Sequence, residues 1–133
     1  LDSNRVSMLI AVTERSSGRR LAGDVFVATV GGAKLSDPGA DLSVCIAVAS
    51  AAVGRPMAAD VLAIGEVALS GDIRPVPYLS QRVAEAARLG YRRVLVPRGA
   101  RKSLPALEGI EFSEVAHLDD ALARLRGLSV VSE

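Results

Sequence analysis

The chain has 133 residues, a length typical of one domain. Half of the residues are hydrophobic and only 3% are aromatic, so Ala, Val, Leu and Ile must form the core. The net charge of +1 is too small to indicate nucleic-acid binding by itself. The single cysteine, Cys45, excludes an internal disulfide, and together with the single His117 it leaves no set of ligands for a Cys/His metal site. We expect Cys45, in an apolar stretch, to be a small buried hydrophobe.

No apolar run approaches the roughly 18 residues that a membrane-spanning helix needs, and no signal-peptide pattern opens the chain. The chain begins at Leu1 without a methionine. We therefore expect a segment of a longer, cytoplasmic protein with no membrane contact.

The first half of the chain predicts two helices around one strand. A helix begins at Asp2 or Ser3 and ends near Gly18, with apolar residues at helical spacing between them. Residues 24–30 are rich in β-forming side chains and stop at two glycines, which predicts a strand. A second helix is predicted over 38–53, because Asp37 before Pro38 is typical of an N-cap followed by proline at the first helical position.

The second half predicts alternating strands and helices. The expected elements are a strand at 61–67, a turn at 70–72, a returning strand at 73–76, a helix from 79 to Gly90, a strand at 93–96, a short helix at 103–107, a strand at 110–115 and a final helix that begins at Leu118. This alternation predicts an α+β (mixed α/β) fold in which one sheet is covered by helices.

Common catalytic motifs are missing from the sequence. The run Gly31-Gly32-Ala33-Lys34 is followed by Leu35, whereas a phosphate-binding loop needs Ser or Thr after the lysine. There is no Gly-x-Ser-x-Gly motif for a hydrolase nucleophile. We expect that this domain alone does not hydrolyse ATP.

Three segments, in one consistent order, resemble the proteolytic domain of Lon-type proteases. Residues 65–76 (GEVALSGDIRPV) are similar to the Gly-Glu-Ile/Val-x-Leu-x-Gly-x-Val/Ile-x-Pro signature of that family. Residues 84–97 resemble the helix, turn and strand that follow the signature, and residues 37–43 resemble the segment that carries the family's nucleophile. The resemblance implies a Lon-like fold of the ribosomal protein S5 domain 2-like type.

Further details resemble RadA-type bacterial DNA-repair ATPases, whose C-terminal domain is Lon-like. They lie at residues 1–5 and 8–9, 24–27 and 30–32, 40–42, and 74–77. The resemblance implies an N-terminal helix and junction from an ATPase core at 1–23, a Lon-protease-like domain at 24–127 and a tail at 128–133.

The residues that would make this domain a protease are replaced. Lon enzymes use a serine and a lysine, and the resemblance places these two positions at Gly39 and Arg82. Glycine has no nucleophile, and an arginine guanidinium stays protonated near neutral pH, so it cannot act as a base. Ser36 and Ser43 lie nearby in the sequence, but neither has a lysine partner in the family's arrangement. We expect no peptidase activity, with a residual serine peptidase as the weakest alternative.

The resemblance to RadA implies a role in DNA repair and recombination. The longer protein would carry a zinc finger and an ATPase core, bind ATP, Mg and Zn outside this domain, and act as a motor for branch migration. This domain would need no cofactor. It would act as a scaffold for a homo-hexameric ring and as a DNA-binding surface.

Basic residues concentrate in one helix–strand–loop unit and suggest where DNA, double-stranded or branched, would bind. The candidates are Arg88, Arg92, Arg93, Arg98, Arg101 and Lys102, with Arg74 and Arg82 as additions. No aromatic residues are interleaved with them, so contact with the phosphate backbone is expected rather than base stacking. Two alternatives remain open: these arginines pair with acids across a subunit interface, or the domain is a purely structural scaffold without DNA contact.

Overall fold

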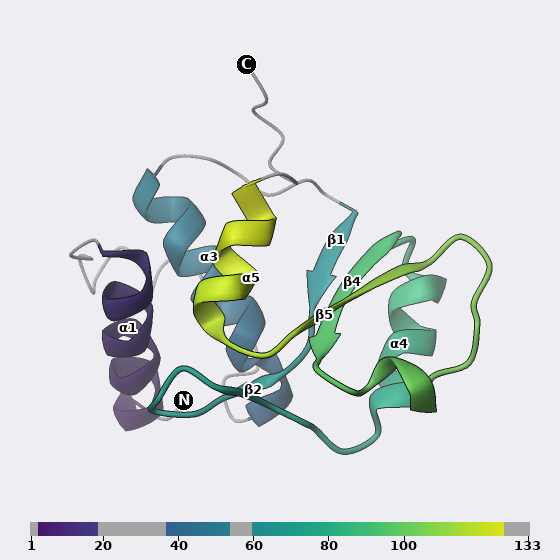
Figure 1. Cartoon of the computed structure of the whole chain (residues 1–133), viewed down its shortest axis with the longest axis horizontal. Helices are drawn as coiled ribbons and strands as arrows, with labels where there is room; N and C mark the ends of the chain where they lie inside the picture. The colour runs from purple at the N-terminus through teal and green to yellow at the C-terminus, as the bar shows by residue number, and fades with distance from the viewer. Residues whose placement is uncertain (1–2, 19–36, 54–59, 127–133) are drawn as a thin grey trace.

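The computed structural model describes residues 3–18, 37–53 and 60–126 (Figure 1). The elements in these ranges are α1 (Ser3–Ser17), the 3-10 helix η1 (Pro38–Ala40), α3 (Asp41–Val53), β1 (Val61–Ala63), β2 (Glu66–Val67), β3 (Ile73–Arg74), α4 (Leu79–Arg88), β4 (Arg93–Pro97), the 3-10 helix η2 (Arg101–Ser103), β5 (Glu111–Val115) and α5 (Leu118–Arg126). The predicted α+β class is confirmed.

The described strands form two small sheets. The order β1-β4-β5 makes a parallel three-stranded sheet, in which Ala63 lies opposite Leu95 and Val94 opposite Phe112. Strands β2 and β3 form an antiparallel hairpin with Val67 opposite Ile73. Of the residues in β4, only Arg93 at its start is not buried, which fits a central strand covered on both faces.

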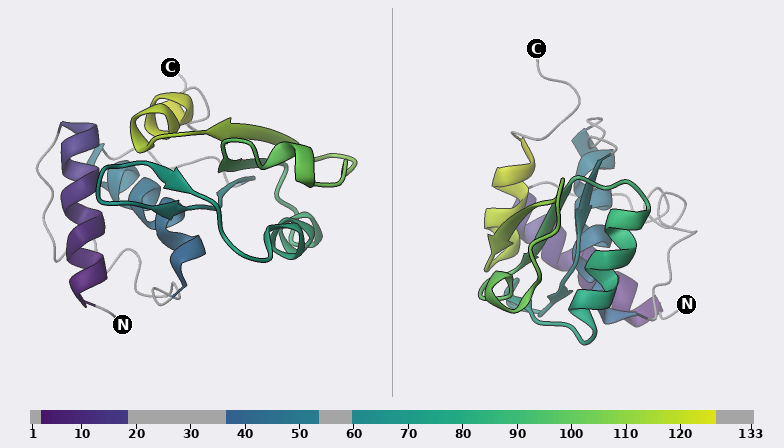
Figure 2. Two further views of the ribbon diagram at one scale, coloured as in Figure 1. Left: turned by 60° about the horizontal axis from the view of Figure 1, so that its bottom comes forward. Right: turned by 90° about the vertical axis from the view of Figure 1, so that its right-hand side faces the viewer.

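Helices lie on both faces of the sheet (Figure 2), and alternation along β4 divides the core between these faces. Val94 and Val96 pack with Val83 and Ala86 of α4 on one face. Leu95 belongs to a second apolar cluster with residues of α1, α3 and α5 on the other face. The sheet is therefore covered by α4 on one side and by the remaining helices on the other.

The predicted strand at 61–67 is wrong in one respect, because it is broken at Ile64-Gly65. The Gly65 N–H donates to the carbonyl oxygen of Gly39 at 3.1 Å, and the Gly65 carbonyl oxygen accepts from the N–H of Leu42 at 3.0 Å. The backbone at Gly65 is thus bonded to η1 and to the start of α3, not to a neighbouring strand. The chain leaves the parallel sheet here and continues as β2 of the hairpin.

The predicted helix at 103–107 is also wrong, because the helical turn is η2, which ends at Ser103. Leu104 has an extended backbone, with φ −102° and ψ 143°. The ring of Pro105 disfavours helical geometry at the preceding residue, which accounts for this end.

Several expectations lie outside the described residues: the strand at 24–30 and the domain boundaries near residues 23 and 127. In the ranges that are described, no helix is long and apolar enough to cross a membrane. Cys45 is buried as expected, and burial raises the pKa of its thiol to about 12.

Candidate functional site

The two positions that correspond to the Lon dyad lie against each other in the fold. Gly39 lies in η1, just before α3, and Arg82 lies in the first turn of α4. A Cβ atom added at Gly39 would be 2.4 Å from Nη1 and 2.7 Å from Cζ of Arg82. The guanidinium therefore occupies the space that any side chain at position 39 would need.

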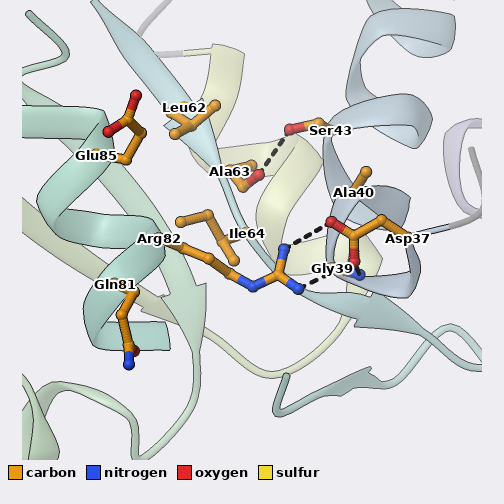
Figure 3. A pocket seen from close by; sticks show the side chains of 10 residues that line it. All are labelled: Asp37, Gly39, Ala40, Ser43, Leu62, Ala63, Ile64, Gln81, Arg82 and Glu85. Atoms are coloured by element: carbon orange, nitrogen blue, oxygen red, sulfur yellow. Dashed lines mark hydrogen bonds and ion pairs between the residues drawn. The ribbon is translucent and has the colours of Figure 1, made fainter. Parts of the chain in front are cut away.

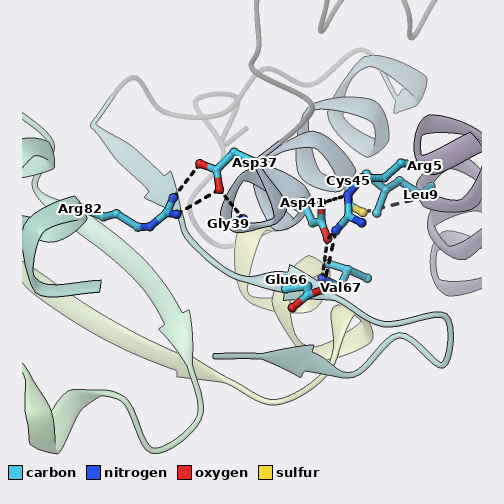
Figure 4. A network of polar contacts seen from close by, with 9 residues as sticks. All are labelled: Arg5, Leu9, Asp37, Gly39, Asp41, Cys45, Glu66, Val67 and Arg82. Atoms are coloured by element: carbon cyan, nitrogen blue, oxygen red, sulfur yellow. Dashed lines mark hydrogen bonds and ion pairs between the residues drawn. The ribbon is translucent and has the colours of Figure 1, made fainter. Parts of the chain in front are cut away.

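Asp37 holds Arg82 in this place through a double ion pair (Figure 4). Nη1 of Arg82 donates to Oδ2 of Asp37 at 2.8 Å, and Nη2 donates to Oδ1 at 3.0 Å. Nε donates to the carbonyl oxygen of Pro77 at 2.9 Å. Hydrogen bonding to Asp37 raises the pKa of Arg82 above its already high ordinary value, so the guanidinium stays charged.

The same carboxylate caps η1. Oδ1 of Asp37 accepts from the N–H of Gly39 at 3.0 Å. The predicted N-cap is thus confirmed, although the first turn is a 3-10 helix and the α-helix begins at Asp41. Asp37 therefore joins the start of the η1–α3 segment to α4.

An open cavity of about 450 Å³ lies beside this ion pair (Figure 3). Its walls come from η1, α3, β1 and α4, and include Gly39, Ser43 and Arg82. The Ser43 hydroxyl donates to the carbonyl oxygen of Ala63 at 2.6 Å. No lysine or histidine is among the described residues that line the cavity, so the lining offers Ser43 no base of the kind that activates a serine.

The structure separates the basic candidates into two groups at opposite ends of β4. Arg88, Arg92 and Arg93 lie near the start of the strand, whereas Arg98, Arg101 and Lys102 follow its end. At about 3.3 Å per residue, the strand places these groups on the order of 13 Å apart along its axis. The two groups therefore lie at opposite ends of the sheet, along the direction of its strands.

Three of the candidates are paired with acids. Arg82 is bound to Asp37, as described above, and Nε of Arg88 donates to Oε1 of Glu85 at 3.0 Å. Nη2 of Arg93 donates to Oδ1 of Asp60 at 2.9 Å, which lowers the pKa of that carboxyl. The remaining five are exposed and make no ion pair with any other described residue: Arg74, Arg92, Arg98, Arg101 and Lys102.

A polar hollow of about 520 Å³ lies beside β5 and α5, next to the second basic group. Arg98, Arg101 and Arg124 line it, together with Glu114 and Asp120. Sequence reasoning missed Arg124, although its position four residues after Asp120 on a predicted helix indicated an exposed cation.

Glu114 fixes the loop that carries the second basic group. Its Oε2 atom accepts from the N–H of Arg101 at 2.9 Å. Backbone N–H groups of Arg101 and Gly99 hold the pKa of this carboxyl below its ordinary value. Within the described ranges, no three His, Cys, Asp or Glu side chains gather in a way that could hold a metal ion.

Comparison with known proteins finds one matching family model and a group of similar DNA repair proteins. Residues 25–100, more than half of the chain, match the family model described as subunit ChlI of Mg-chelatase. The chain is 43% identical over 129 residues to the DNA repair protein RadA of Haemophilus influenzae, covering 96% of this chain and 28% of that protein. It is 43% identical to RadA of Escherichia coli over 124 residues and 42% identical to RadA of Pseudomonas aeruginosa over 127 residues.

The chain spans little more than a quarter of the length of these relatives. The similarity to these relatives extends over nearly all of this chain, so the chain is homologous to one segment of the RadA proteins. Because residues 25–100 match its family model, the chain belongs to the family described as subunit ChlI of Mg-chelatase.

Proposed function

We propose that this chain is the C-terminal Lon-like, non-proteolytic domain of a RadA-type DNA repair protein. In this proposal it contacts the DNA backbone and acts as a scaffold for a hexameric ring. The observation that carries it is the contact between Gly39 and Arg82, which Asp37 holds in place. The longer protein would be an ATP-dependent recombination motor for branch migration, with its zinc finger and its ATP and Mg sites outside this chain.

The Gly39–Arg82 contact supports both the Lon-like fold and the loss of protease activity in this proposal. The resemblance paired these positions as a nucleophile and its partner, and such a pair must be adjacent in space. Gly39 and Arg82 are adjacent, although they lie in separate elements. Their side chains, however, supply neither a nucleophile nor a base.

The DNA surface is proposed at the end of β4, where three exposed cations follow one another. Arg98, Arg101 and Lys102 make no ion pair within the described ranges. Arg124, which is paired with Asp120, lines the same hollow as Arg98 and Arg101. Unpaired cations can bind phosphate without first giving up a carboxylate. Arg74 and Arg92 are exposed as well, whereas Arg82, Arg88 and Arg93 would have to leave their acids.

The test is fluorescence anisotropy of labelled duplex DNA with the purified chain at several salt concentrations. Binding through phosphates makes the logarithm of the binding constant fall linearly with the logarithm of salt, by about 0.9 for each phosphate neutralised. The triple variant Arg98→Gln, Arg101→Gln, Lys102→Gln should bind more weakly and have a shallower slope. Arg88→Gln, which removes a cation already paired with Glu85, is the matched control and should keep the slope.

Measurements on the same purified chain distinguish two alternatives to this function. A purely structural scaffold would self-associate while showing no salt-dependent DNA affinity, and the triple variant would then behave like the parent chain. A residual peptidase would cleave an unfolded protein substrate, and that cleavage would disappear in Ser43→Ala, the serine that lines the cavity.

A further inference from the structure

Tyr78, immediately before α4, is the one aromatic side chain among the described residues that faces solvent. It is 71% exposed, whereas Tyr91 and Phe112 are partly buried against the apolar cluster between α4 and the sheet. An exposed ring keeps two apolar faces in water, which makes it a candidate for contact with another molecule.

The backbone at Tyr78 has a conformation that a tyrosine rarely adopts. Its φ of 60° and ψ of 35° lie in the left-handed region, and no other described residue except glycine has a positive φ. A side chain is strained in this region, whereas glycine is not. Strain of this kind persists where the surrounding structure imposes it, and it is found most often at functional sites.

Neighbouring residues hold Tyr78 in this conformation. Its carbonyl oxygen accepts from the N–H of Arg82 at 3.0 Å, and the carbonyl oxygen of Pro77 accepts from Nε of Arg82 at 2.9 Å. The ring of Pro77 fixes φ at the residue before Tyr78. Val76 and Leu79 pack against the apolar cluster between α4 and the sheet. The exposed ring is therefore attached to a rigid support.

The loop after β4 lies at the same end of the parallel sheet. Figure 1 shows that α4 begins at the end of the sheet where η2 follows β4. Ala100 and Leu104, on either side of Arg101 and Lys102, pack against the same apolar cluster as the residues next to Tyr78. Tyr78 and these two cations thus lie on neighbouring loops.

Both loops are positively charged. Residues 74–82 and 97–107 contain five cations and no Asp or Glu. Three of these cations are exposed and make no ion pair with any other described residue: Arg74, Arg101 and Lys102. Arg74 precedes Tyr78 by four residues, so their Cα atoms are at most about 14 Å apart. Cations available for an anionic partner therefore accompany the exposed ring.

An exposed ring among unpaired cations fits a nucleic acid strand. The cations bind phosphates, and the ring stacks on a base. The base must be unpaired, because in a continuous duplex neighbouring base pairs cover both of its faces. An acidic protein segment would use the cations but gain little from the ring, and an apolar segment would leave the cations unused.

We propose that Tyr78 stacks on an unpaired base of a DNA strand whose phosphates contact Arg74, Arg101 and Lys102. This inference rests on the DNA contact of the proposed function and adds a residue that distinguishes DNA with unpaired bases from continuous duplex. The cations bind both forms of DNA, whereas the ring contributes only where a base is unpaired.

Tryptophan fluorescence tests the stacking directly. The chain contains no tryptophan, so Tyr78→Trp introduces a single reporter. A single-stranded oligonucleotide should quench its emission, because an indole stacked on a base loses fluorescence, whereas a blunt duplex bound to the same extent should not. Leu89→Trp, at the other end of α4 and 60% exposed as leucine, is the matched control and should not be quenched by either DNA. Equal quenching of both reporters, or no quenching of Tyr78→Trp by bound single strand, would overturn the proposal.

Affinity gives a second readout. Tyr78→Gly removes the ring and relieves the strain, so this variant should fold at least as stably as the parent. Its affinity for single-stranded DNA should fall about 5- to 150-fold, the equivalent of one lost base–aromatic stack, while its duplex affinity and salt slope stay unchanged. Tyr78→Phe keeps the ring and should keep the affinity. Equal single-strand affinity of the parent and Tyr78→Gly would contradict stacking.

The same titrations separate failure of this inference from failure of the proposed function. Salt-dependent duplex binding, with single-strand binding unchanged in Tyr78→Gly, would overturn the stacking and leave the DNA contact standing. A folded parent chain that binds neither form of DNA at low salt would contradict both. Poly-glutamate that binds as tightly as the oligonucleotide, and more weakly to Tyr78→Gly, would overturn the proposal in favour of an acidic protein segment.

Discussion

Gly39 and Arg82 depend on each other, since the guanidinium lies where a side chain at position 39 would be. Arg82 is held by Asp37 and by the carbonyl oxygen of Pro77, so it cannot move aside without losing these bonds. A serine nucleophile at position 39 and the present arrangement of Arg82 exclude each other. Restoring only one member of a Lon-type dyad would therefore disturb the fold before it produced any chemistry.

A double-mutant cycle measures this dependence. Gly39→Ala should destabilise the protein by no more than about 1 kcal/mol, because the new methyl group displaces only the end of the Arg82 side chain from its ion pair with Asp37. Arg82→Ala removes the same partly exposed ion pair and should also cost no more than about 1 kcal/mol. In the Arg82→Ala background the second substitution should be nearly neutral, giving a coupling of about 0.5–1 kcal/mol in urea unfolding. Additive costs would mean that the two residues do not compete for space.

At the scale of elements, Asp41 connects α1 with the start of α3 and with β2. Its side chain is 2% exposed; it accepts from Nε of Arg5 at 2.9 Å and from the N–H of Val67 at 3.0 Å. Burial raises the pKa of Asp41 above its ordinary value, and the bonds from Arg5 and Val67 oppose that rise. Arg5 thus compensates a buried charge while it attaches α1 to the rest of the fold.

Arg5→Leu tests whether Arg5 compensates the buried charge of Asp41 and so stabilises the fold. A buried carboxylate without its cation costs up to about 3 kcal/mol, and the pKa of Asp41 in the folded state should rise further. A folded-state pKa above the unfolded value of 3.8 means that the folded protein binds the proton more readily, so stability falls as pH rises through that interval. The loss caused by Arg5→Leu should therefore be smaller at pH 4 than at pH 7. Denaturant unfolding at the two pH values measures it, and an equal loss at both would contradict the role of the charge.

Glu114 binds the loop that carries Arg98, Arg101 and Lys102, and its pKa is shifted in the opposite direction to that of Asp41. Its pKa is lowered by the N–H groups of Arg101 and Gly99, so the carboxylate form is favoured in the folded state. The contribution to stability is present above the unfolded value of 4.5 and is lost as pH falls through the folded value. The protection factor of the Arg101 amide, which is its exchange rate relative to the intrinsic rate at the same pH, should fall on acidification in the parent chain. In Glu114→Gln the protection factor should be lower at neutral pH and should no longer respond to acid over that range.

Most element types followed from local patterns, and of the two errors the helix at 103–107 neglected the local effect of Pro105, whereas the break in the strand at 61–67 depends on contacts distant in sequence. The N-cap at Asp37, the apolar face of α4 and the end of that helix before Gly90 were readable because each depends on a few neighbouring residues. The break at Gly65 could not be read, because it depends on hydrogen bonds to Gly39 and Leu42.

The candidate site could likewise be predicted only in part from the sequence. The resemblance identified Gly39 and Arg82 as corresponding positions, but no sequence pattern indicated that Asp37 would neutralise the arginine. Arg93 likewise counted as a free cation until the fold brought Asp60 beside it. The net charge of a segment is readable from sequence, whereas the pairing of each charge requires the tertiary structure.

For the whole molecule, the two ends of β4 are expected to differ in their effect on DNA binding. At one end Arg93 is ion-paired with Asp60, next to Arg92. At the other end Arg98, Arg101 and Lys102 make no ion pair with a described residue, although Glu114 lines the same hollow as the two arginines. Charge reversal of Arg92 and Arg93 should therefore lower duplex affinity less than reversal of Arg98 and Arg101. Anisotropy at one fixed low salt concentration compares the two pairs, and the reverse order would move the proposed DNA surface to the start of the strand.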